Sequence, residues 1–220
     1  LTAIVVATAT GFFVFGAFLA LALWLPRYYM GVYGVPVKTA GLLAALYSGP
    51  GSIFRALGGW ASDKWGARKI MYWTFIVSVL CLFILSYPST EYIVQGVKEN
   101  IHFSIEIPLV FFVIVTFILG FFMSLGKAAV YKHIPVYYAD NVGSVGGIVG
   151  LIGGLGGFCL PILFGYLNDT FQIWTTCFMV LFIITFVALI WMHAAIRILE
   201  NKTYKDLNMP KYFPEVDNKK

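Results

Sequence analysis

Long apolar segments separated by short polar ones dominate the pattern of this chain. A helix that spans a lipid bilayer needs roughly 20 apolar residues, and six windows of about that length follow one another along the sequence. They cover approximately residues 4–25, 39–61, 70–87, 108–131, 143–167 and 173–199. Because these windows are much longer than the roughly ten-residue strands of a transmembrane barrel, the pattern predicts an all-α integral membrane bundle of six helices within residues 1–200.

Two stretches are too polar to enter lipid. Residues 88–107 carry three Glu, one Lys and one His, so we expect an extracytoplasmic insertion that forms a surface loop with room for a short helix. Residues 201–220 contain two prolines and end in two lysines, so we expect a solvated tail.

Composition and charge agree with a membrane protein. The chain is 60% hydrophobic and 11% charged, whereas a soluble domain is about 25% charged, and its mean hydropathy is +0.85. Of the 15 Lys and Arg residues, eleven fall on the side that holds both chain ends, three fall on the other side, and Arg55 falls inside a span. The positive-inside rule therefore predicts cytoplasmic ends in an inner (plasma) membrane. The net charge of +5 fits anionic lipid neighbours and requires no nucleic acid.

The sequence offers few residues that suit metal binding or catalysis. The three Cys fall inside predicted spans and the three His are scattered, so no metal or cofactor is expected. No nucleophile with a paired base is evident either, which argues against an enzyme. The absence of an initiator Met and of a basic leader suggests a piece of a longer polypeptide.

The junction between the second and third windows, GGWASDKWGARK (58–69), concentrates charge beside a glycine. Asp63 and Arg68 could hold two helix ends together and release them when helices rock, although any cytoplasmic loop can carry such charges. The segment resembles the signature loop of the major facilitator superfamily, G-x-x-x-D-x-x-G-R-K, with Ala67 inserted. This resemblance implies one half of a twelve-helix transporter. We expect the C-terminal half, partnered by an N-terminal six-helix half, with gating roles for Asp63 and Arg68.

The fifth window, GSVGGIVGLIGGLGGFCLPILFG (143–165), holds nine glycines. Small residues at such spacing are common in close helix packing, but they also let a ligand approach the backbone. The run resembles the glycine-rich nitrate signature of the nitrate/nitrite porters of the NarK type, and GKAAVYKHIPVYYADNVGSVGG (126–147) is similar to the connection that precedes it. The resemblance implies that Gly153, Gly154, Gly156 and Gly157 line a substrate site.

Arg55 is the residue that needs an explanation. It lies about 12 Å along the helix from Asp63, where a charge is costly unless it is paired or hydrated. Snorkelling toward the rim is one alternative, but helical side chains lean toward the N-terminus, here the membrane centre. In the porters that the chain resembles, an arginine at this position binds the anion. Phe15 stands at a position where, in those porters, an aromatic ring lies against the anion. The planar guanidinium fork suits a planar oxyanion.

Lys127 is a second charge inside a predicted span. It could snorkel to the interface, or it could face a cavity, attract the anion and respond to its passage as a gating residue. No Asp or Glu occurs in the six windows, so nitrate/nitrite exchange and proton-coupled nitrate entry both remain open.

The expected function is secondary transport of nitrate and/or nitrite by alternating access. Two alternatives are a major facilitator carrier of another small anion and a non-transporting membrane assembly module.

Overall fold

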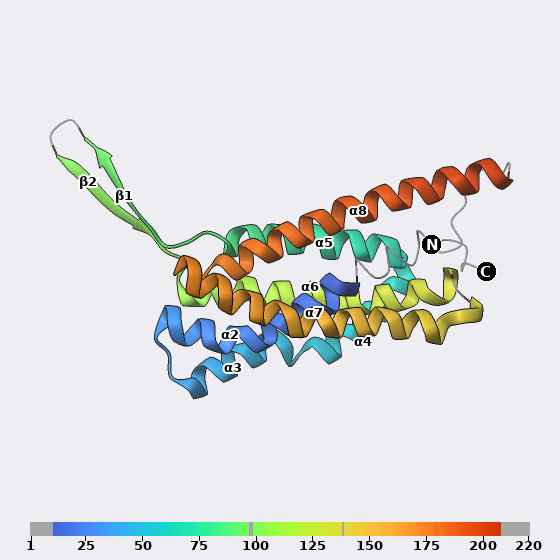
Figure 1. The fold of residues 1–220 in the computed structure, drawn as a ribbon, viewed down its shortest axis with the longest axis horizontal. Coiled ribbons are helices and arrows are strands. Elements are labelled where there is room, and N and C mark those ends of the chain that lie inside the picture. The colour runs from blue at the N-terminus through green and yellow to red at the C-terminus, as the bar shows by residue number, and fades with distance from the viewer. Residues whose placement is uncertain (1–10, 97–98, 138, 208–220) are drawn as a thin grey trace.

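A computed structural model describes residues 11–96, 99–137 and 139–207, and Figure 1 shows an elongated bundle whose long helices run side by side. The helical elements are η1 (Phe12–Ala17, a π-helix), α2 (Phe18–Tyr33), α3 (Val37–Ser48), α4 (Gly51–Trp65), α5 (Ala67–Leu85), α6 (Leu109–Tyr137), η2 (Ala139–Asn141), α7 (Val142–Phe171) and α8 (Thr176–Leu207). The strands are β1 (Thr90–Gln95) and β2 (Asn100–Ile105).

The helical membrane bundle predicted from the sequence is confirmed. In the described part of the chain, five helical stretches are long and apolar enough to cross a membrane. They are Phe12–Tyr33, Ala67–Leu85, Leu109–Lys132, Val142–Phe171 and Thr176–Ile198. Each corresponds to one of the predicted windows, although residues 4–10 of the first window lie outside the described residues.

The remaining window, 39–61, is divided between α3 and α4. The division falls at Gly49 and Pro50, and α4 begins directly after the proline. Proline lacks a backbone N–H, and its ring clashes with the carbonyl four residues earlier, so the Gly49–Pro50 pair disfavours one continuous helix at this point. The two shorter helices follow one another along the bundle (Figure 1).

The described part of the insertion at 88–107 is an exposed antiparallel hairpin of β1 and β2, so the short helix expected within this surface segment is wrong. Tyr92 pairs with Phe103 and Val94 with Ile101, which places apolar side chains on one face. The rings of Tyr92 and Phe103 stack with their centres 5.3 Å apart. Alternation with period two favours strands, and the polar residues of the segment obscured it. The hairpin projects from one end of the bundle in Figure 1.

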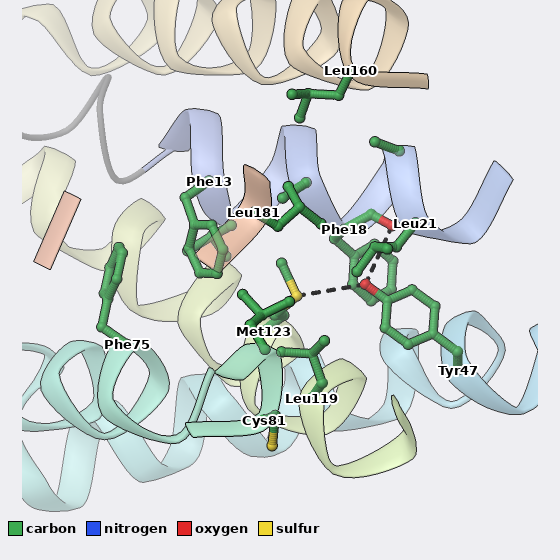
Figure 2. Packing of buried hydrophobic residues seen from close by; sticks show 14 of the residues in the cluster. Phe13, Phe18, Leu21, Tyr47, Phe75, Cys81, Leu119, Met123, Leu160 and Leu181 are labelled. Atoms are coloured by element: carbon green, nitrogen blue, oxygen red, sulfur yellow. Dashed lines mark hydrogen bonds between the residues drawn. The ribbon is translucent and has the colours of Figure 1, made fainter. Parts of the chain in front are cut away.

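Helix α6 lies at the centre of the bundle and contacts α3, α4, α5, α7 and η1. Close approach depends on small residues, because a Cβ on Gly120 would lie 2.6 Å from the carbonyl oxygen of Tyr47. Figure 2 shows the packing at this level, where the hydroxyl of Tyr47 donates to the carbonyl of Phe18 at 3.4 Å and to the sulfur of Met123 at 3.5 Å. This packing brings α6 against the first helix, where the candidate site lies.

Candidate functional site

Arg55 lies on α4 and is directed toward α6. Its Cζ atom is 5.4 Å from the centre of the Tyr131 ring, a cation–π arrangement. The Arg55 side chain is exposed in this chain, whereas Tyr131 belongs to α6, the helix at the centre of the bundle. Tyr131 was not among the site residues predicted from the sequence. Its spacing of four residues from Lys127 could have indicated it, since residues four apart share a helix face.

Tyr131 is in turn packed against the first helix. Its ring meets that of Phe15 edge to face, with centres 5.2 Å apart and an angle of 84°. Two glycines of α7 lie beside it, since a Cβ on Gly146 or Gly150 would make an ordinary contact with the tyrosine side chain, at 3.9 or 3.6 Å. Phe15 and Arg55 are therefore brought to the same tyrosine from two different helices.

Lys127 reaches across to η1 and α2 instead of toward the end of its helix. Its Nζ atom lies 3.2 Å from the ring centre of Phe18 and 5.6 Å from that of Phe15. The side chain is half-buried. The structure thus gathers two cations around one pair of aromatic rings, Phe15 and Tyr131.

The four glycines predicted to line the site have different surroundings. A Cβ on Gly153 would lie 2.6 Å from Cβ of Phe15, so this glycine contacts the aromatic pair. Gly156 and Gly157 pack against the first helix, where a Cβ would approach Gly16 and Leu19 to 3.0 and 2.5 Å. Gly154 has no atom within 4 Å of its ideal Cβ position beyond its own helical neighbourhood. Contact of any of them with a ligand stays a prediction.

At the far end of α4, Asp63 forms an ion pair with Lys132 of α6. Gly66 makes the turn into α5 with φ of +87°, a conformation that favours glycine. Arg68 lies in the first turn of α5 and is half-buried. The sequence identified Asp63 as part of a latch but did not identify Lys132 as its partner.

Within the residues described, no group of three or more His, Cys, Asp or Glu side chains lies close enough to hold a metal ion.

Comparison with curated proteins found similarity to nitrate and nitrite transporters. The chain is 46% identical over 190 residues to the probable nitrate/nitrite antiporter NarK1 of Thermus thermophilus, covering 83% of the chain and 42% of that relative. It is 28% identical over 200 residues to the nitrite extrusion protein of Bacillus subtilis, covering 90% of the chain and 45% of the relative. It therefore spans less than half the length of these relatives.

Solved structures of transporters share the fold. The crystal structure of tetrameric PepTSo2 matches 91% of the chain and 41% of its own length, with a TM-score of 0.71 and 14% identity. The inward-open xylose transporter XylE from E. coli matches 93% of the chain and 51% of its own length, with a TM-score of 0.66 and 16% identity. At these identities the likeness shows the fold alone.

The family assignment covers nearly the whole chain. The sequence pattern of the Major Facilitator Superfamily matches residues 4–208. The family and the relatives are transporters, which confirms the expectation that the chain is not an enzyme. The chain belongs to the Major Facilitator Superfamily.

Proposed function

We propose that this chain is the C-terminal six-helix half of a secondary transporter that moves nitrate and/or nitrite by alternating access, and that Arg55 binds the anion. The names of the similar proteins support the substrate, and the family supports the transport cycle. The arrangement of Arg55, Tyr131 and Phe15 supports the place of binding.

The observation that carries the proposal is the setting of the Arg55 guanidinium. A charged side chain exposed to hydrocarbon is costly, yet Arg55 is exposed in this chain and lies over Tyr131, whose ring packs against the Phe15 ring that Lys127 approaches. A polar cleft between this half and another half would satisfy these groups. There the guanidinium can donate two parallel hydrogen bonds to a planar oxyanion, with the Tyr131 ring beside it and the Phe15 ring packed against Tyr131.

The ion pair between Asp63 and Lys132 supports a gating role at the end of α4. Asp63 is 70% exposed and Lys132 is 32% exposed, and ion pairs this accessible contribute about 0 to 1 kcal/mol. Such a contact can break and re-form in every transport cycle. We place Asp63, Arg68 and Lys127 in this gating function, with both chain ends cytoplasmic in an inner or plasma membrane.

The test is nitrate transport by the full-length carrier in proteoliposomes. Wild type should accumulate or exchange labelled nitrate, and Arg55→Gln should lose this activity because glutamine lacks the charge. Arg27→Gln is the matched control, since Arg27 is exposed over the ring of Trp24 in α2, away from the candidate site. Wild-type rates from Arg55→Gln would reject the proposal.

Competition with other anions defines the cargo. Unlabelled nitrate or nitrite should inhibit uptake of labelled nitrate more strongly than formate, chlorate or bicarbonate does. Equal or stronger inhibition by one of these three would instead identify a carrier of a different small anion.

A further inference from the structure

Helices α5 and α8 lie side by side, run in opposite directions and keep one register between two contacts. The rings of Phe83 and Phe182 have centres 5.7 Å apart, and the hydroxyl of Tyr72 shares a hydrogen bond of 2.9 Å with Nδ1 of His193. The two contacts are eleven residues apart on each helix, about three helical turns. Figure 1 shows this helix pair on the side of the bundle away from α3.

The next turn of each helix carries an arginine. Arg68 lies four residues before Tyr72 on α5. Arg197 lies four residues after His193 on α8. Residues four apart share a helix face, and the helices are antiparallel, so both arginines lie on the same side of the hydrogen bond, toward the end where α5 begins. The register thus brings two guanidinium groups to one level of the bundle.

This end of the helix pair is rich in cations. α5 begins with Arg68 and Lys69 and has no acidic side chain in its first turn, although a helix N-terminus favours negative charge. The sequence of α5 contains no Asp or Glu, and the first in α8 is Glu200. A guanidinium has five donors in a planar fork, so each arginine can hold a phosphate oxygen together with a protein partner. The arrangement suits an anion with several oxygens.

Two exposed tryptophans indicate where the membrane surface lies. Trp73 follows Tyr72 on α5, and Trp191 lies two residues before His193 on α8. Tryptophan is enriched at the interface between the apolar core of a membrane and its headgroups. The two arginines lie one turn further from the membrane centre, which is the level of the lipid headgroups.

On the other side of the tryptophans, both helices expose large apolar side chains. They are Ile76, Leu80 and Phe83 of α5 and Phe186 and Ile190 of α8. Acyl chains can cover these side chains and remove them from contact with other molecules, whereas a free phosphate ion gains nothing from them. Apolar side chains that lead to two arginines therefore favour a phospholipid over a free anion.

We infer that α5 and α8 bind an anionic phospholipid, whose phosphate lies between Arg68 and Arg197 and whose acyl chains lie along the apolar side chains of the two helices. The hydrogen bond between Tyr72 and His193 fixes the helices together beneath the headgroup. The headgroup must carry a net negative charge, because two cations at one level repel one another and a zwitterionic lipid brings its own positive charge. This lipid site involves neither nitrate nor Arg55, so it does not depend on the proposed function.

The experiment measures how lipid stabilises the full-length carrier purified in detergent. Thermal unfolding is followed with added phosphatidylglycerol, with phosphatidylcholine of the same acyl chains, and with inorganic phosphate. Phosphatidylglycerol should raise the melting temperature more than either of the others, because a ligand stabilises the folded state that binds it. Equal stabilisation by phosphatidylcholine would overturn the requirement for an anionic headgroup. Equal stabilisation by inorganic phosphate would overturn the lipid in favour of a free anion.

Variants test where the headgroup binds. Arg197→Gln should weaken phosphatidylglycerol binding about fivefold, the effect expected for one arginine near a membrane surface. Arg197→Lys keeps the charge and should bind this lipid more tightly than Arg197→Gln. Lys64→Gln is the matched control for the loss of one cation, because Lys64 is exposed at the same end of the bundle over Trp60 and Trp65 of its own helix, α4. It should bind phosphatidylglycerol like wild type.

Lipid that is purified with the protein gives a second readout. Mass spectrometry of extracted lipid should find less phosphatidylglycerol with Arg197→Gln than with wild type or Lys64→Gln. Equal affinity and equal retained lipid in Arg197→Gln and wild type would overturn the assignment to α5 and α8. An equal loss in Lys64→Gln would overturn it as well, since any cation at this end of the bundle would then be sufficient.

Discussion

Replacing Gly153 by alanine should disturb the aromatic pair of the candidate site. The new Cβ would lie 2.6 Å from Cβ of Phe15, which is 0.8 Å shorter than the shortest ordinary contact of 3.4 Å. A Cβ atom is fixed to its backbone, so Phe15 cannot avoid the overlap by changing rotamer. Helices η1 and α7 would have to separate, and Phe15 would shift relative to Tyr131 and Lys127.

The magnitude follows from two opposing terms. Extra atoms in a packed interior cost about 1 to 3 kcal/mol, whereas alanine is favoured over glycine inside a helix by about 0.5 to 1 kcal/mol. Gly154→Ala is the matched control, because it lies one residue further along the same helix with no atom of another element within 4 Å. The helix term is common to both variants, so the difference between them, about 1 to 3 kcal/mol, reports the overlap with Phe15.

The assay is thermal unfolding of the full-length carrier in detergent, with and without nitrate. Gly153→Ala should melt several degrees below Gly154→Ala. It should also show a smaller stabilisation by nitrate, because Phe15 has moved. Equal melting temperatures and equal nitrate stabilisation for the two variants would refute the packing of Gly153 against Phe15.

Three further predictions concern contacts around the site. Tyr131→Ala should weaken nitrate binding about 2- to 30-fold, the range expected for a lost cation–π contact, whereas Tyr131→Phe keeps the ring and should bind nitrate like wild type. Calorimetric titration measures both affinities, and an equal loss of affinity in the two variants would contradict the prediction. Gly66→Ala should lower the free energy of unfolding of the carrier by about 1 to 3 kcal/mol because position 66 has a positive φ. Gly59→Ala, in the interior of α4, should not lower it, and denaturant unfolding of the two variants measures the difference. Asp63→Lys alone should lose transport, and the double variant Asp63→Lys with Lys132→Asp should recover it because the ion pair is restored with its charges exchanged. Equal transport by the single and double variants would show that the ion pair does not matter for the cycle.

The fold was predictable because lipid imposes a strong constraint on the sequence. Each membrane span must be a long apolar segment, and such segments are visible without knowledge of tertiary structure. What the hydropathy pattern did not reveal was local. Pro50 divides a window in which Arg55 is the single charged residue, and the hairpin alternates over segments too short and too polar to be noticed among long helices.

The candidate site was predictable only in part. Arg55 and Lys127 were evident because charges are rare inside spans, and Phe15 followed from the family resemblance. Tyr131 was missed because one tyrosine among thirteen carries no signal until α6 is packed against η1. Lys132 was missed as the partner of Asp63 because the ion pair joins α4 to α6, which are distant in sequence.

The central claim is that the Arg55 guanidinium recognises a planar oxyanion. The most direct measurement is the dissociation constant of nitrate for the full-length carrier, compared among wild type, Arg55→Lys and Arg55→Gln, with chloride as the reference anion. The account predicts saturable nitrate binding in wild type, weaker binding when lysine keeps the charge but not the fork, and no measurable binding with glutamine. Equal nitrate affinity in all three proteins would contradict it.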